Sequence, residues 1–230
     1  MYGEKSLGRL IGLMMLLAMA ASMTGFFVVL PPAFADPGYL VNAAVHADRV
    51  RGGALLVLVP AALMLGIALA GWPLFRRHGE RAALGLLALA AVLLAVTVVE
   101  QGLLLGMLSL SQAFDGAGPT QRGAFEAARV VAGGARYWIH YLALFSSGVA
   151  SLTLYALLFR SRLLPRVLPA FGVAAVALHL AAIMLHVGGQ PFDLTLVAPA
   201  GIGQLVTGCW LAALGFHPQA AAPVAGAGVA

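Results

Sequence analysis

The sequence predicts an all-α membrane protein, a polytopic bundle of six transmembrane helices. Hydrophobic residues make up 62% of the 230 positions and charged residues only 9%, whereas about a quarter of a soluble domain is charged. The apolar residues gather in six runs of roughly 20 or more, the length that crosses a hydrocarbon core about 30 Å thick. The links between these runs are short and polar, or contain Pro and Gly.

Each apolar run is interpreted as one membrane span. The expected spans cover residues 8–30, 52–75, 82–110, 137–159, 165–188 and 193–216. Together they form one domain, residues 1–218, and a disordered cytoplasmic tail is expected over 219–230, where the sequence has little apolar bulk. The first run has a second interpretation as a signal peptide cleaved after Ala35, in AFAD. Its apolar stretch is longer than the roughly 7 to 15 residues of a signal peptide core, which favours retention as a span.

The distribution of positive charge predicts that both termini are cytoplasmic. Eight of the 13 Lys and Arg residues lie in the N-terminal segment and in the second and fourth links, and five lie in the links on the other side. Because Lys and Arg are enriched on the cytoplasmic side, we expect a multi-pass inner-membrane protein with this orientation. The two larger outer links, residues 31–51 and 111–136, contain amphipathic stretches suited to the membrane surface or to packing on the bundle.

Composition also limits the partners and the chemistry. The formal charge of +5 does not indicate nucleic acid, because the basic residues form short clusters between apolar runs rather than one patch. The expected partners are the lipid bilayer and, as alternatives, another membrane protein or a second copy of this chain. The single cysteine, Cys209, excludes an internal disulfide and Cys-pair metal motifs. The sequence contains no P-loop, GxSxG or HExxH motif.

Polar residues within the expected spans are the candidates for a binding pocket, because such groups are costly in hydrocarbon unless they are paired or hydrated. They are Glu100, His140, His179, His186 and Gln204. At about 1.5 Å rise per residue, the four ionisable groups all fall in the outer half of the membrane. We therefore expect Glu100 and His140 to converge with one of the two fifth-span histidines. The alternative is structural, with Glu100 hydrogen-bonded to a neighbouring helix and the outer histidines facing interfacial water.

Metal binding is a further hypothesis for the same residues. Glu100, His140 and His179 would supply three ligands and leave an open position for zinc-activated water. Haem would need two facing histidines at matched depth, and His140 with His186 comes nearest to this. No cofactor is predicted, and zinc and haem stay as alternatives.

Several stretches resemble a bacterial family of integral membrane proteins catalogued as domain of unknown function 4386. They are LFRRHGERAALG, VVEQ, HYLALFSSGVASLTLYALLFRSRLLPRVLPAFG and WLAALGFHP, and the similarity runs from about residue 8 to residue 218. The resemblance implies six spans, and the family's third-span glutamate and fourth-span histidine correspond to Glu100 and His140. The family pattern also resembles a form with a glutamate and a lysine where this chain has Gln204 and Leu214, so a two-carboxylate site is not implied here. The family brings no established activity.

The leading hypothesis is a non-enzymatic membrane protein that binds a small hydrophobic ligand or a partner membrane protein within its bundle. One alternative is a metal-dependent enzyme or haem protein with an outer-leaflet Glu/His site. Another is a small transporter whose second and sixth spans are broken at Pro60 and Pro199.

Overall fold

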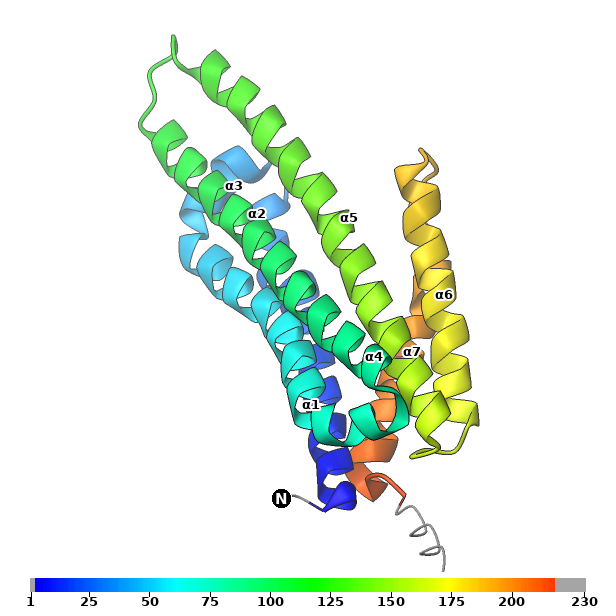
Figure 1. Cartoon of the computed structure of the whole chain (residues 1–230). Coiled ribbons are helices and arrows are strands. Elements are labelled where there is room, and N and C mark those ends of the chain that lie inside the picture. Colours follow the sequence, from blue (N-terminus) through cyan, green and yellow to red (C-terminus); the bar gives the residue numbers. More distant parts are fainter. Residues whose placement is uncertain (1–2, 218–230) are drawn as a thin grey trace, which may run out of the picture.

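The computed structural model of the protein describes residues 3–217, so the predicted tail over 219–230 lies outside the described residues. Within this range the regular structure is helical throughout, which confirms the all-α prediction. The helices are α1 (Glu4–Thr24), the π-helix η1 (Gly25–Val29), α2 (Pro31–Phe34), α3 (Tyr39–Val45), α4 (Ala47–Asp115), α5 (Arg122–Ser161), α6 (Val167–Val187) and α7 (Leu194–Leu214), as shown in Figure 1.

Five helical segments of the described chain are long and apolar enough to cross a membrane, which supports a membrane protein. They are α1 with η1, then α4, α5, α6 and α7. The 69-residue α4 is not one straight rod, because Gly79 has non-helical backbone angles of φ 163° and ψ 90°. Figure 1 shows the ribbon of α4 reversing direction at its lower end, so residues 47–78 and 80–115 are two arms of a helical hairpin.

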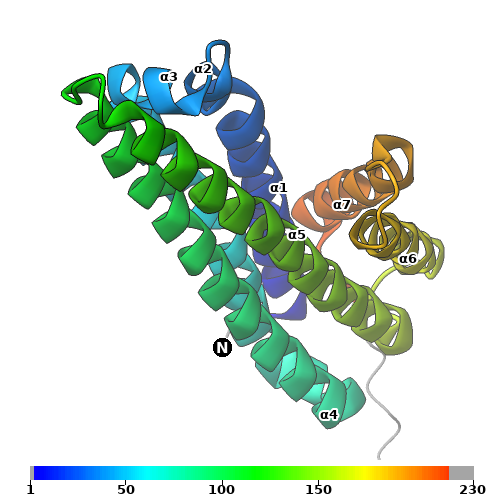
Figure 2. The same ribbon diagram turned by 90° about the horizontal axis from the view of Figure 1, so that it is seen from above.

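The long helices pack in a closed ring. The order is α1, α4, α5, α6, α7 and back to α1, with each helix contacting the next. Figure 2 shows α4 on one side of α5 and both α6 and α7 on the other. Because α5 separates α4 from α6 in this ring, the order of the helices decides which polar residues can meet.

Close contact between the first and last long helices closes the ring. A Cβ atom added at Gly12 would overlap the backbone of Ala212 and Gly208, and one added at Gly8 would overlap that of Phe216. Small residues spaced four apart let two transmembrane helices approach to this distance. The same spacing at Gly102 and Gly106 is not used in this way, because no atom lies within 4 Å of either added Cβ.

The two ends of the described chain lie side by side. A Cβ at Gly215 would overlap the backbone of Lys5, and the Arg9 side chain donates a hydrogen bond to the carbonyl of Ala213 at 3.2 Å. The link after α5 packs against the same end of the bundle, where the amide of His217 donates to the carbonyl of Leu163 at 3.0 Å. Leu163 is fully buried, which explains why this short basic link carries leucines.

Two links, residues 31–51 and 111–136, are more helical than the span boundaries alone suggest. Helix α3 lies in the first of them and is tied to α4, since the Tyr39 hydroxyl donates to the carbonyl of Leu104 at 2.9 Å. The link over residues 111–136 largely continues α4 and α5, so that α5 has 40 residues and is about 60 Å long, roughly twice the hydrocarbon thickness. Polar residues mark where a helix leaves the hydrocarbon, and this point differs from where the helix ends.

Candidate functional site

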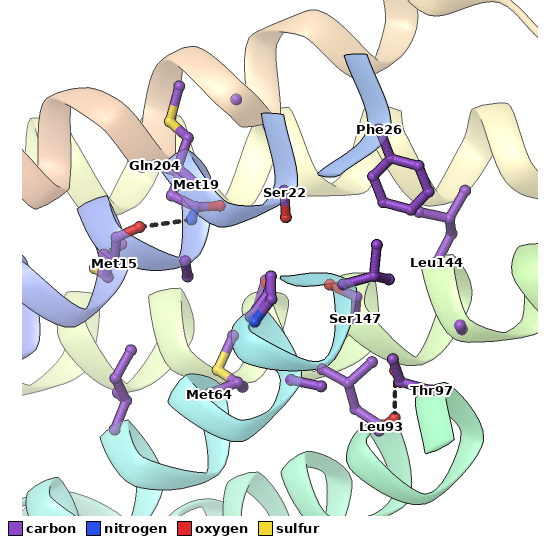
Figure 3. Close-up of a pocket in the computed structure, with 18 of the residues that line it drawn as sticks. Met15, Met19, Ser22, Phe26, Met64, Leu93, Thr97, Leu144, Ser147 and Gln204 are labelled. Carbon is purple, nitrogen blue, oxygen red and sulfur yellow. Dashed lines mark hydrogen bonds between the residues drawn. The ribbon is translucent and has the colours of Figure 1, made fainter. Parts of the chain in front are cut away.

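A cavity of about 230 Å³ lies between α1, both arms of α4, α5 and α7. Figure 3 shows its wall, where Met15 and Met19 of α1, Met64 of α4 and Leu144 of α5 surround the same space. With Met23, four of the eight methionines in the chain line this cavity. Methionine is flexible and polarisable, so it forms adaptable apolar surfaces at binding sites.

The carboxylate and the imidazole of the cavity wall belong to Glu100 from the second arm of α4 and His140 from α5. Glu100 Oε1 lies 2.8 Å from His140 Nδ1, and both residues line the cavity. Glu100 is only 1% exposed, whereas His140 is partly buried. An ionised carboxylate only accepts hydrogen bonds, so a hydrogen bond between such a group and Nδ1 has the ring N–H as its donor. The structure therefore brings two of the candidate residues into direct contact.

Arg136 provides the balancing charge. Its Nη2 atom lies 3.9 Å from the same Glu100 oxygen, and the side chain is 17% exposed. The guanidinium also lies over the ring of Phe34, with 5.1 Å to the centroid. A buried carboxylate is strongly disfavoured without a compensating charge, and Arg136 supplies one.

Sequence reasoning missed Arg136 because it was assigned to the outer link, where an arginine is unremarkable. A signal was nevertheless present, since Arg136 precedes His140 by four residues and so shares its helix face. The same face of α5 continues along the cavity at spacings of three and four with Leu144, Ser147, Ser151 and Tyr155. Figure 3 shows Leu144 and Ser147 at the wall.

Gln204 is the third candidate residue that lines the cavity. Its Nε2 atom donates to the carbonyl of Met15 at 3.1 Å, so it joins α7 to α1, as the dashed line in Figure 3 shows. Pro60 also lines the cavity. The helix continues through both Pro60 and Pro199, so the breaks proposed for the second and sixth spans are not present.

The two histidines of α6 do not join the Glu100 pair. His179 Nε2 lies 3.5 Å from the carbonyl of Leu144 on α5. His186 accepts from the Tyr137 hydroxyl at 2.6 Å through Nε2, and its Nδ1 lies 2.9 Å from the carbonyl of Gln190. We expected one of these histidines to lie beside Glu100 and His140. Instead, α5 lies between α6 and α4, and both rings contact residues of α5.

The family to which the chain belongs follows from a comparison with family models. The model described as a domain of unknown function (DUF4386) matches residues 10–215. The chain belongs to the DUF4386 family. The match includes every residue of the cavity wall, so the cavity is part of the DUF4386 domain. The comparisons with curated proteins and with solved structures found no match.

The residues considered for zinc and haem take different positions in the DUF4386 fold. Across residues 3–217, no three His, Cys, Asp or Glu side chains form a group that could hold a metal ion. Zinc sites use at least three protein ligands, and of Glu100, His140 and His179 only the first two are in contact. His140 and His186, the nearest to a haem pair, are in contact with different partners, Glu100 and Tyr137.

Proposed function

We propose that this protein is a six-span membrane protein that binds a small hydrophobic molecule in the cavity, with the Glu100–His140 pair at its polar end. The observation that carries this proposal is a buried, charge-balanced carboxylate and histidine on the wall of an otherwise largely apolar cavity. Ligand pockets typically combine apolar walls with a few convergent polar groups that orient the ligand.

The six-span topology is supported by two features of the fold. Lys5 and Gly215 lie against each other, so an even number of membrane crossings separates them. The two arms of α4, which meet at Gly79, would raise the five long segments to six crossings. The excess of Lys and Arg at the end that holds both termini supports a cytoplasmic location for them in a bacterial inner membrane.

Binding is favoured over a purely structural role because the pair lines a cavity. A structural ion pair between helices is normally surrounded by packed side chains, since protein interiors contain few voids larger than a water molecule. A volume of about 230 Å³ corresponds to about eight groups the size of a water molecule at roughly 30 Å³ each. Four methionines around this space would allow the wall to adapt to an irregular apolar ligand.

A second candidate function is a membrane-embedded enzyme that acts on a lipid-soluble substrate. It is favoured by the geometry of His140. This residue lines the cavity, and its Nδ1 is hydrogen-bonded to Glu100. A carboxylate that orients a histidine in this way is the arrangement of a general base. This function would require a substrate that is converted rather than retained.

The binding proposal is tested by filling the cavity. Gly201 lines it and has no atom within 4 Å of an added Cβ, so Gly201→Phe adds a ring at the cavity wall without a clash at Cβ. Gly102 is equally open but outside the cavity wall, so Gly102→Phe is the matched control. We expect mass spectrometry of extracts from the purified protein to find a bound apolar molecule in wild type and Gly102→Phe, and much less of it in Gly201→Phe. The same molecules in the same amounts in all three proteins would contradict the proposal.

A further inference from the structure

We propose that the cavity recognises an alcohol, a small apolar molecule whose hydroxyl group donates a hydrogen bond to Nε2 of His140. This inference rests on the proposed binding function and specifies the chemical class of the ligand. It follows from the balance of charge around Glu100 and from the position of the proton on the imidazole ring.

The charges at the polar end of the cavity already cancel. Glu100 carries the negative charge and Arg136, 3.9 Å away, carries the positive one. A protonated imidazole would add a second cation beside a largely apolar cavity, with no further carboxylate in contact to balance it. We accordingly take the imidazole to be neutral, so that the site carries no net charge.

The neutral ring has a single N–H group, and its location is determined by Glu100. Because Nδ1 donates to the carboxylate at 2.8 Å, Nε2 is an unprotonated acceptor. Nε2 has no hydrogen-bond partner among the residues that the structure describes. A ligand in the cavity can satisfy this atom only by donating a hydrogen bond.

This requirement distinguishes alcohols from amphipathic molecules that offer only acceptors or that carry a charge. A ketone, an ether or a quinone offers only acceptors and would leave Nε2 unpaired. A fatty acid would bring a second carboxylate toward Glu100, and the two negative charges would repel. An alkyl ammonium would bring a second cation, but Glu100 is already paired with Arg136. A hydroxyl group adds no charge and supplies the donor.

The size of the cavity suggests suitable probes. About eight water-sized groups fit the volume, so an eight-carbon chain fills it approximately. Octan-1-ol and 1-methoxyheptane are isomers with the same number of heavy atoms, and only the first donates a hydrogen bond. Octanoate and octylammonium have the same chain length and test the two charges.

The experiment measures displacement of tritiated octan-1-ol from the full-length protein in lipid nanodiscs, with empty nanodiscs to correct for partition into lipid. We expect octan-1-ol to bind about tenfold more tightly than 1-methoxyheptane, the contribution of one hydrogen bond. Both charged probes should be weaker than the alcohol. In His140→Phe, which keeps a ring but removes the acceptor, the two isomers should bind equally.

The outcomes separate this inference from the proposed function. Equal binding of the two isomers to the wild-type protein would overturn recognition of an alcohol while leaving a hydrophobic binding cavity. Preference for octanoate or octylammonium would have the same consequence. If none of the four probes binds, both the inference and the proposed function are wrong. The comparison of isomers uses the wild-type protein, so it does not depend on whether His140→Phe folds.

Discussion

His140 Nδ1 lies 2.8 Å from Glu100 Oε1, and this hydrogen bond joins α5 to the second arm of α4 at the wall of the cavity. The two residues are 40 positions apart in sequence and belong to different helices. Since Arg136 approaches the same oxygen, the carboxylate has two partners from α5. The pair therefore has a structural consequence in addition to any role in binding.

Glu100→Gln should destabilise the protein substantially. The substitution removes the charge that balances Arg136 and leaves its guanidinium without a carboxylate partner. Breaking a buried ion pair on one side costs about 3 to 5 kcal/mol. We expect a clear fall in the midpoint of thermal unfolding in detergent. The control is Glu126→Gln. It breaks the exposed pair between Glu126 and Arg129, both on α5, and should change the unfolding temperature little. Equal effects of the two substitutions would show that the buried pair of Glu100 and Arg136 contributes no more to stability than the exposed pair.

Gly12→Ala should weaken the contact between α1 and α7. The added methyl group would overlap the backbone of Ala212, so the helices must move apart. Such overpacking costs about 1 to 3 kcal/mol. Gly106→Ala is the matched control, since the same methyl group meets no atom within 4 Å there and alanine favours the helix. Unfolding in detergent should begin at lower temperature for Gly12→Ala only. If Gly106→Ala is equally harmful, the close approach of α1 and α7 is not the cause.

The polar pair could be predicted from the sequence because each residue is the ionisable group of its own apolar run. Glu100 and His140 also come to similar depths when the residues are counted from the ends of their spans. Depth does not identify neighbours, however. His179 has a comparable depth, but it lies on α6, which packs on α5 and α7. The order of helices around a ring depends on tertiary packing that periodicity alone does not encode.

The hairpin of α4 was predictable, because the basic stretch around Gly79 separates two long apolar runs. The extension of α5 before residue 137 was not, because hydropathy identifies the part of a helix that fits the membrane rather than the whole helix. Arg136 lies in this extension, which is why a partner of Glu100 was assigned to a link.

Tyr39→Phe should reduce stability in a way that depends on pH. Burial raises the pKa of the Tyr39 hydroxyl from 10.0 to about 12, although the nearby Arg136 acts in the opposite direction. The folded state thus favours the neutral hydroxyl, which donates to the carbonyl of Leu104. Its contribution is complete below pH 10 and is lost as the pH rises toward 12.

The measurement is the difference in unfolding temperature between wild type and Tyr39→Phe in detergent, from pH 8 to the alkaline limit. We expect a difference that corresponds to about 1 kcal/mol below pH 10 and declines above it. Comparison with the phenylalanine variant removes the contributions of the other tyrosines. A difference that grows with pH would contradict the assigned donor role of the hydroxyl.

Removal of metal should leave the protein unchanged. Glu100 and His140 provide two ligands in contact, fewer than a protein site for zinc normally uses. We therefore expect less than one equivalent of zinc by elemental analysis, and the same unfolding temperature with and without a chelator. A stoichiometric metal that is lost together with stability would favour the alternative of a metal-dependent enzyme over the binding proposal.

Cysteine labelling should place Glu80 and Thr120 on opposite sides of the membrane. Glu80 follows the reversal of α4, and Thr120 lies between α4 and α5, one helical arm away. Both side chains are exposed, so Glu80→Cys and Thr120→Cys can each be introduced after the native Cys209 is replaced by serine. In spheroplasts, a membrane-impermeant maleimide should label residue 120 directly and residue 80 only after lysis, because basic links remain cytoplasmic. Labelling of both positions in intact spheroplasts would mean that residues 80–115 do not cross the bilayer, and labelling of residue 80 alone would invert the orientation.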